Sequence, residues 1–483
     1  MEEKLKKAGD VAIVAWYILL ITLFMYYIEN NYFNMLEAKS RVVHLGMLAF
    51  IGVSTLILLM KLLYVPVNET IKSYVARLTL LDYGVLLFAL AAIWSNVFTD
   101  YKEAALYGSY GWSVGTLWIV GLCFTYFFLS NHHGFNAGYL YLAAVCVGVE
   151  LLWVCVNGFY VDPLGMHERL AAVDYPRYVG SIGNTNWYVG FVTMVLPFFL
   201  LGAEKVDSLQ KRLGLSILLI LATISAVTIN CMGIYLGFGA VMAAYLCYSF
   251  STKRRLELAM ENIAVMGTGL GILALLADQF AMVQLDWANE LLLKPYVFGV
   301  VIVVALGMDG FLKNRKEETY EKWKKLYLTL FCIILFFGGA IVLYTQVKTF
   351  DDSWGTNRGG IWKVAIKTFL DFPLIQKLFG GGTGCFGYYY LELTGSDWVR
   401  NAHNEYLEFL VTTGIVGGIS YVGIYVGAWM EAVKRKNLLS TIAVLSLTGY
   451  AAQALVNNPQ ALNGAVFISI LAMIKWKQAF CLL

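Results

Sequence analysis

The sequence predicts an all-α polytopic membrane protein with about 12–14 transmembrane helices. Of its 483 residues, 59% are hydrophobic and only 14% are charged, whereas an ordinary soluble domain carries about 25% charged residues. The mean hydropathy is +0.66. With 7 Pro and 45 Gly, the chain is neither disordered nor collagen-like, because those classes need a polar or repetitive composition. We therefore expect residues 1–483 to form a single integral membrane domain.

Fourteen apolar segments have the length and composition of membrane helices. Each is a run of apolar side chains with few charges, as expected of a helix among lipids or other apolar helices. The first follows the charged residues Met1–Asp10 without a small-residue cleavage site, so we interpret it as a membrane helix and not as a signal peptide. The segments are residues 11–28, 42–63, 80–97, 111–129, 137–158, 186–201, 213–230, 233–250, 263–277, 295–312, 326–344, 403–429, 438–456 and 461–474.

The distribution of basic residues predicts the orientation of these helices. With the N-terminus in the cytoplasm, 23 of the 35 Lys and Arg fall on the inner side and 12 on the outer side, and six of those 12 lie in one loop. Clusters such as Lys253–Arg255 and Lys434–Lys436 are then on the inner side. Cytoplasmic loops of membrane proteins carry such an excess of positive charge. We therefore expect both termini to be cytoplasmic.

Net charge and cysteine placement argue against several other classes. The net charge is only +3, so we expect no nucleic-acid partner. Of the eight cysteines, Cys385 alone lies in a long polar loop, which argues against a disulfide framework. The adjacent pair Asp351-Asp352 lacks the spacing of a metal-binding DxD motif, and we expect neither a metal ion nor a cofactor.

Two outer loops are long enough to form a site, the longer at residues 346–402 and the shorter at residues 159–178. In the longer loop, apolar residues recur at helical spacing until Pro373 ends the pattern. They are Trp362, Ile366, Phe369 and Leu370. We expect a long extracytoplasmic active-site loop that carries short amphipathic helices at the membrane surface. A lid with a purely structural role is the alternative.

Two arginines lie where an anion could bind, since a guanidinium can form two parallel hydrogen bonds with a phosphate. Arg358 opens the amphipathic helix, where free backbone amides and the positive helix end favour an anion. The alternative for Arg358 is a solvated loop charge. Arg177 precedes the sixth apolar segment. The alternative to an anion-binding role for Arg177 is contact with lipid headgroups. The stretch after Arg177 contains residues that allow tight turns with amide donors, namely Gly180, Gly183, Asn184 and Asn186.

His403 has the features of a general base. We expect it in the first turn of a helix with Asn401 as the N-cap. The helix dipole disfavours an imidazolium there, so the ring would stay neutral and able to accept a proton. A histidine bonded to a loop carbonyl is the alternative. Glu405 is the nearest other base, but two positions along a helix it would point about 200° away from His403.

Three segments together resemble the O-antigen ligase and O-antigen polymerase superfamily. They are residues 177–186, residues 357–374, and residues 402–417, where a His-Asn pair is followed by Tyr-Leu and a Gly-x-x-Gly helix. The resemblance implies an enzyme in the cytoplasmic membrane of a bacterium, with its active site on the outer face. Such an enzyme transfers a glycan from undecaprenyl diphosphate to an acceptor hydroxyl without a nucleotide sugar or metal. The implied partners are this lipid-linked donor, a glycan, lipid or protein acceptor, and membrane lipids.

The resemblance also implies residue roles. Arg358 matches the loop arginine that binds the lipid diphosphate, and His403 matches the essential histidine. Where the family has Ser-Arg-Gly, this chain reads Ile229–Gly233 without an arginine, so Arg177 or Arg400 would have to supply a second diphosphate ligand. The family's Gly-x-Gly is shifted to Gly380–Gly384. Supporting positions in the same segments are Asn184, Asn186, Asn357, Asn404, Glu405 and Tyr406.

Two functions remain open at this point. The first is an inverting glycan ligase or polymerase, because direct attack by the acceptor inverts the anomeric centre and no outer carboxylate pair calls for a covalent intermediate. The second is a transporter or flippase of an anionic lipid-linked glycan. A carrier needs polar groups near the middle of the membrane, whereas the charges within these spans lie singly or near span ends. Those charges are Lys61, Asp82, Glu150, Asp309, Glu405 and Glu408.

Overall fold

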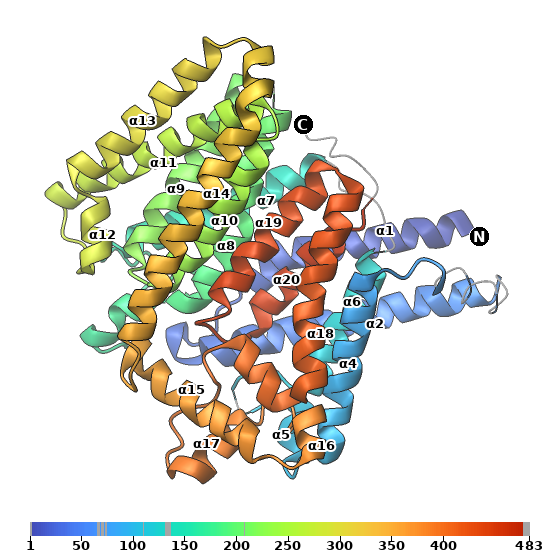
Figure 1. Cartoon of the computed structure of the whole chain (residues 1–483). Helices are drawn as coiled ribbons and strands as arrows, with labels where there is room; N and C mark the ends of the chain where they lie inside the picture. Colours follow the sequence, from blue (N-terminus) through green and yellow to red (C-terminus); the bar gives the residue numbers. More distant parts are fainter. Residues whose placement is uncertain are drawn as a thin grey trace. The chain divides into compact units, whose positions relative to one another are not determined.

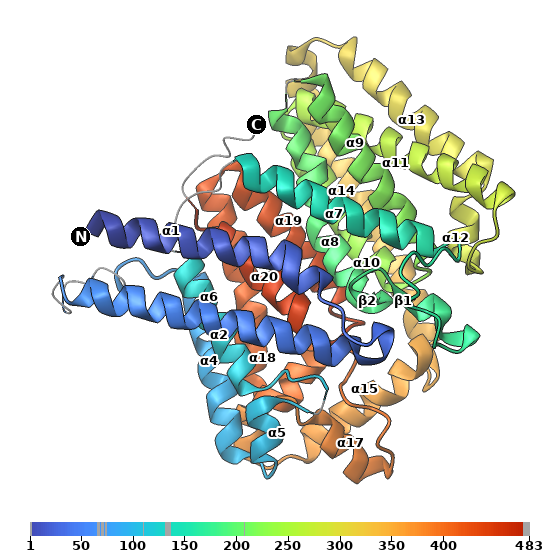
Figure 2. The same cartoon turned by 180° about the vertical axis from the view of Figure 1, so that it is seen from behind.

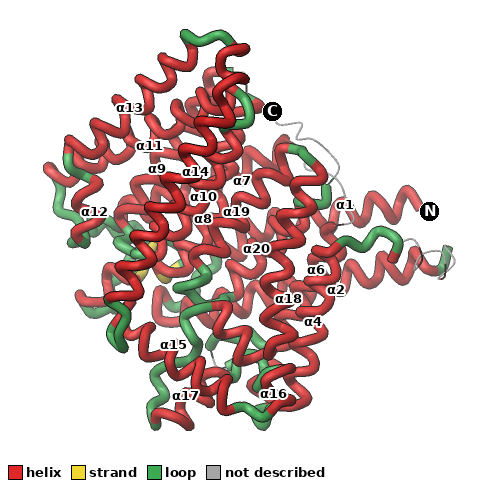
Figure 3. The backbone as a smooth tube through the Cα atoms, viewed as in Figure 1, coloured by secondary structure: helices red, strands yellow, loops and turns green. Residues whose placement is uncertain are grey.

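The structure is a computed structural model, and it describes residues 2–64, 68, 72, 75–109, 111–130, 137–206 and 208–476. Within these residues most of the backbone is helical, and one pair of two-residue strands is present (Figure 3). Ten of the described helices are long and apolar enough to cross a membrane. Four shorter apolar helices complete the set, so that a helix coincides with each of the fourteen predicted segments. The chain is an all-α polytopic membrane protein, as predicted.

The helices divide between two compact units. The first unit comprises residues 1–140, 351–447 and 453–481, and the second comprises residues 141–350, 448–452 and 482–483. The helices of the first unit are α1 (Glu2–Leu19), α2 (Met35–Leu62), α4 (Leu80–Phe98), α5 (Lys102–Tyr107), α6 (Thr116–Ser130), α15 (Trp354–Asp371), α16 (Leu374–Phe379), α17 (Phe386–Thr394), α18 (Glu405–Arg435) and α20 (Ala461–Met473).

The second unit contains most of α7 and five residues of α19, two helices that begin in the first unit. Its strands form a small antiparallel hairpin that precedes α8 (Figure 2). The elements are α7 (Ala137–Asn157), β1 (Tyr178–Val179), β2 (Gly183–Asn184), α8 (Thr185–Gly202), α9 (Leu209–Thr228), α10 (Gly233–Ser249), α11 (Lys253–Gln279), α12 (Trp287–Leu292), α13 (Pro295–Lys313), α14 (Glu317–Lys348) and α19 (Leu438–Gln453).

In the first unit, α18 packs along α4 (Figure 1). Glycines allow the two backbones to approach closely: a Cβ at Gly427 would lie 2.6 Å from the Leu81 Cα atom. Small residues of this kind permit close helix packing in membranes. This contact fixes the direction of α18, whose first turn carries several of the predicted site residues.

A buried ion pair joins α4 to the end of α20 in the same unit. The Lys475 Nζ atom lies 2.8 and 2.7 Å from the two carboxylate oxygens of Asp82, and the Tyr126 hydroxyl donates to the same carboxylate at 2.8 Å. A buried charge is costly unless it is paired and hydrogen-bonded. These contacts therefore explain why a charged residue, Asp82, occurs within an apolar segment.

Candidate functional site

A break in α18 sets the position of its first half. Gly414 has φ +69° and ψ −171°, which interrupts the helix. The loop after α16 fills the break: the N–H groups of Gly381 and Gly382 donate to the carbonyls of Val411 and Thr412 at 2.9 and 3.1 Å. The two glycine-rich motifs noted in the sequence are therefore parts of one structural feature, which holds the half-helix 405–413 against the long loop.

The turn that carries His403 lies just before α18. The Asn404 side chain accepts hydrogen bonds from two backbone N–H groups of the first turn at 3.0 and 3.1 Å, so it is the N-cap and α18 begins at Glu405. The expectation that Asn401 caps the helix and that His403 lies in its first turn is wrong. The Asn401 side chain accepts instead from the His403 N–H at 3.1 Å. His403 has φ +47°, a left-handed conformation that is uncommon outside glycine.

Arg358 lies at the start of the regular part of α15. Gly355, Thr356 and Asn357 have φ values of +60°, +62° and +69°, so the helix is interrupted directly before Arg358. Asn tolerates this conformation better than most residues, which gives Asn357 a structural role. The half-buried Arg358 guanidinium donates to the Gly355 carbonyl at 2.7 Å.

The amphipathic helix predicted after Arg358 is present, but the face that packs inward differs in part from the predicted one. Ile361 and Ala365 are buried against the side chains of α17 and its neighbours. Ile366 and Leu370 are exposed. Exposed apolar residues on this helix of the loop 346–402 are what a helix at a membrane surface requires.

The charge of Arg358 acts on His403, although the two residues lie in separate segments. Burial, and secondly the positive charge of Arg358, lower the pKa of His403 to about 4. The imidazole is therefore neutral at pH 7 and able to accept a proton. The neutral ring agrees with the prediction, but its cause differs. The dipole of α18 was expected to lower the pKa, whereas burial and the charge of Arg358 do so, and His403 lies outside the helix.

Glu405 and Tyr406 belong to a polar and aromatic cluster within α18. Glu405 is buried and accepts a hydrogen bond from the Tyr421 hydroxyl, which lies 2.9 Å from the Tyr425 hydroxyl. The Tyr406 ring centroid is 5.7 Å from that of Tyr421. The Glu405 carboxylate thus has a structural partner in the second half of α18.

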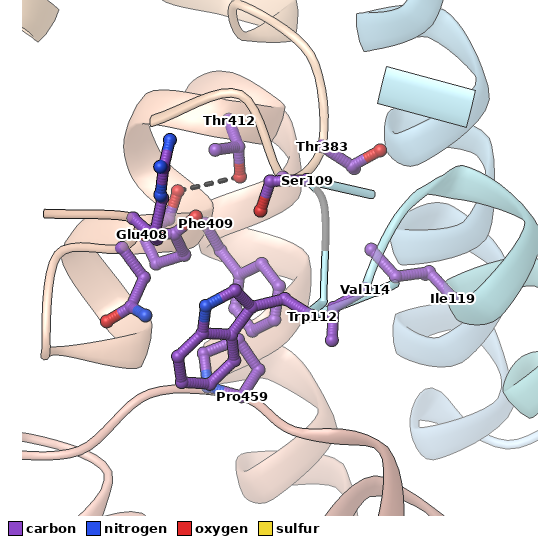
Figure 4. A pocket seen from close by; sticks show the side chains of 12 residues that line it. Ser109, Trp112, Val114, Ile119, Thr383, Glu408, Phe409, Thr412 and Pro459 are labelled. Carbon is purple, nitrogen blue, oxygen red and sulfur yellow. Dashed lines mark hydrogen bonds between the residues drawn. The ribbon is translucent and has the colours of Figure 1, made fainter. Parts of the chain in front are cut away.

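A small cavity adjoins the first half of α18 (Figure 4). Its volume is about 20 Å³, which is room for about one water molecule. Arg400 and Asn401 line it together with Glu408, and so does Trp112 of the segment before α6. Arg400 and the buried carboxylate of Glu408 thus line the same cavity.

Glu408 is the residue of this region whose role sequence reasoning missed. It is 4% exposed, and its carboxylate accepts a hydrogen bond from the Ala402 N–H at 2.8 Å. An acidic residue in an apolar helix, five positions after a candidate catalytic histidine, was the available signal.

Arg177 and the glycine-rich turn after it lie in the second unit. Arg177 pairs with Asp174 at 2.9 Å on the surface. The donors of the turn are engaged inside the protein: the N–H groups of Ser181 and Ile182 donate to the buried carboxylate of Glu150 at distances from 3.0 to 3.2 Å. The expectation that this turn presents its amides to an anion is wrong for these two donors, because Glu150 of α7 already accepts from them.

The other polar candidates of the second unit have local structural partners. Asn184 caps α8 by accepting from the Asn186 N–H at 2.8 Å. The Asn186 side chain accepts from the Cys231 thiol at 3.4 Å, in the segment Ile229–Gly233. In that segment Asn230 accepts hydrogen bonds from the Asp286 N–H and from the Asn289 side chain. Asn230 thus tethers the loop before α12.

Cys385 is buried, with its thiol near the carbonyls of Tyr101 and Thr383 at 3.7 and 3.6 Å. Burial raises the pKa of this thiol to about 12. Although Cys385 lies in the long polar loop, it is part of a packed core between α15 and α17, and it is not an accessible labelling site.

Among the described residues, no three His, Cys, Asp or Glu side chains lie together as metal ligands do. Asp352 pairs with Lys363 at 2.7 Å, and Asp351 accepts from the Ser353 hydroxyl at 2.7 Å. The adjacent carboxylates therefore have partners within the loop.

Residues 295–422 match the family model described as O-antigen ligase. The match extends from α13 to the first part of α18, so it includes Arg358 and His403 and leaves out Arg177. No curated protein matches the chain. Over these residues the chain is similar to the O-antigen ligase family, which confirms its resemblance to the O-antigen ligase and polymerase superfamily.

Proposed function

We propose that this protein transfers a glycan from undecaprenyl diphosphate to an acceptor hydroxyl at the outer face of a bacterial cytoplasmic membrane. Arg358 binds the donor diphosphate and His403 is the general base. The family match supports a glycan ligase or polymerase in a membrane. The observation that carries the residue roles is that Arg358 acts electrostatically on a half-buried His403 whose ring stays neutral at pH 7.

The proposed step is a single displacement at the anomeric carbon. The acceptor oxygen forms the new glycosidic bond while the bond to the diphosphate breaks, and the hydroxyl proton moves to the imidazole of His403. Negative charge grows on the departing diphosphate, so a guanidinium that binds it more tightly in the transition state lowers the barrier. The step needs no metal ion, and one displacement inverts the anomeric centre.

The test uses the full-length protein in proteoliposomes with an undecaprenyl-diphosphate-linked glycan and an excess of chelator. Transfer of the glycan to an added acceptor supports a ligase, and elongation of the donor lipid alone supports a polymerase. Movement of the lipid across the bilayer without loss of its glycan would identify a flippase and overturn the proposal. Activity that appears only with magnesium or manganese would overturn its metal independence.

A further inference from the structure

Glu408 is a buried carboxylate next to the proposed base, and the reaction described above leaves it without a role. Its Oε2 atom accepts a hydrogen bond from the Ala402 N–H at 2.8 Å. Ala402 is fully buried and directly precedes His403. The contact therefore reaches from the first half of α18 back to the turn that carries the histidine.

Three side chains hold this turn in one arrangement by hydrogen bonds to its backbone and to the first turn of α18. Asn401 accepts from the His403 N–H, Asn404 caps α18, and Glu408 accepts from the Ala402 N–H. In this arrangement His403 has φ +47°. A residue other than glycine keeps such a backbone conformation only where its surroundings impose it. Each of these contacts therefore contributes to the placement of the His403 ring.

The charged groups around the turn have distinct partners. Arg358 of α15 is the charge that acts on His403. Arg400 lines the cavity beside Glu408, and Glu405 is bonded to Tyr421. The carboxylate that contacts the backbone of the turn is that of Glu408.

We propose that Glu408 is a positioning residue for His403. By fixing the Ala402 N–H, it holds the imidazole in the buried place where burial and Arg358 keep it neutral. The inference rests on the proposed function, because it adds a residue to the same reaction. What the Ala402 N–H needs is an oxygen acceptor at this distance, which glutamine offers and leucine does not.

The experiment compares full-length wild type with Glu408→Gln and Glu408→Leu in the proteoliposome assay, measuring kcat, KM and the pH dependence of kcat/KM. Glu431→Leu is the matched control, because Glu431 is also a buried carboxylate of α18 but pairs with Arg435 at 2.8 Å near the helix end. We expect Glu408→Leu to lower kcat at least about ten-fold with little change in KM for the donor. Its acid limb should move from about pH 4 toward the ordinary histidine value of about 6.5. Glu408→Gln should stay within about three-fold of wild type and keep the acid limb.

Glu408→Asp provides a second test that does not depend on tolerance of leucine in the protein interior. It keeps the charge but shortens the reach to the Ala402 N–H, so we expect slow turnover and a shifted acid limb here as well. Normal turnover of Glu408→Asp would overturn the proposal.

Two further outcomes would overturn it. If Glu408→Leu lowers the amount of folded protein but leaves kcat per folded molecule and the pH profile as in Glu431→Leu, then Glu408 is a structural residue. If Glu408→Gln is as slow as Glu408→Leu, the carboxylate charge itself takes part in the reaction. Failure of the proposed function is distinguishable, because then the wild type transfers no glycan either.

Discussion

At the scale of single residues, the proposed binding of the donor diphosphate by Arg358 implies that the basicity of His403 depends on the donor. In the free protein, burial and the guanidinium charge hold the pKa of His403 at about 4. The imidazole is then a weak base. A bound diphosphate would bring negative charge beside Arg358 and so favour the imidazolium. Binding of the donor should therefore raise the pKa of His403 toward neutrality, where a general base is most effective at physiological pH.

This coupling predicts two different acid limbs. The acid limb of kcat/KM, which reports the free enzyme, should lie near pH 4, and the limb of kcat, which reports the donor complex, should lie at higher pH. Coinciding limbs at about pH 6.5 would contradict an effect of burial and Arg358.

The same shift of the His403 pKa affects the stability of the fold. The unfolded chain binds a proton at this histidine between about pH 6.5 and 4 while the folded one does not. His403 therefore makes the fold less stable as pH falls through that window.

His403→Ala should leave binding of the donor lipid largely intact while turnover falls by about 10² to 10⁴, the usual contribution of a positioned general base. The measurement is donor binding and single-turnover transfer by the same preparation. His167→Ala is a control in the second unit, where His167 pairs with Asp162 in the loop 159–178. Loss of donor binding in His403→Ala, with normal turnover of the remaining complex, would make His403 a phosphate ligand.

Arg358→Lys should impair transfer although it keeps the charge, because an ammonium cannot form the two parallel hydrogen bonds of a guanidinium. A loss of about 1.4 to 3 kcal/mol in transition-state binding corresponds to about ten- to hundred-fold less activity. Lys363→Gln in the same helix is the control, since Lys363 is exposed and pairs with Asp352. Near-normal turnover of a folded Arg358→Lys protein would reduce Arg358 to a surface charge.

At the scale of elements, the break in α18 is what brings the helix start to the long loop. A continuous helix would use the carbonyls of Val411 and Thr412 within itself. At Gly414 these carbonyls accept instead from the loop 380–384. Broken helices of this kind occur in membrane proteins where the freed backbone groups are satisfied by the protein.

Gly414→Ala should therefore damage the site from a distance. The new Cβ would lie 2.4 Å from the Leu378 backbone carbonyl in a left-handed conformation, and the combined cost of crowding and conformation is about 2 to 4 kcal/mol. We expect a lower thermal unfolding temperature of the detergent-solubilised protein and slower transfer. Gly423→Ala is the control on the same helix, because a Cβ there meets no atom within 4 Å. Equal stability of the two variants would show that the break at Gly414 is not required.

At the scale of the whole molecule, the even number of predicted spans and the charge asymmetry predict that the long loop is outside and both termini are inside. Two exposed positions test this orientation. A cysteine at Asp352 should react with a membrane-impermeant maleimide on intact cells, and a cysteine at Lys434 should react only after the membrane is opened. The reverse pattern would overturn the orientation. Native Cys385 cannot serve as the reporter, because it is buried.

Apolar periodicity and composition were enough to predict the fourteen apolar helices that the described part of the chain contains, because a span in lipid must satisfy its own backbone and so is encoded locally. The His-Asn-Glu-Tyr segment and the loop arginine could likewise be read from the sequence, since residue type and spacing carry that information. The predicted N-cap failed because Asn401 and Asn404 are equally good caps in sequence, and the hydrogen bonds of each were decided by the fold around them.

Local sequence was sufficient to predict the class of the protein, its apolar helices and the candidates Arg358 and His403. Which groups act on these two residues depends on how the chain packs. The neutral state of His403 comes from burial and from a charge on α15. Glu150 of α7 accepts from the donors of the glycine-rich turn, and Glu408 accepts from the Ala402 N–H directly before His403. These are contacts between residues distant in the chain or across a turn, and local sequence preferences do not encode which acceptor a backbone N–H will meet once helices pack.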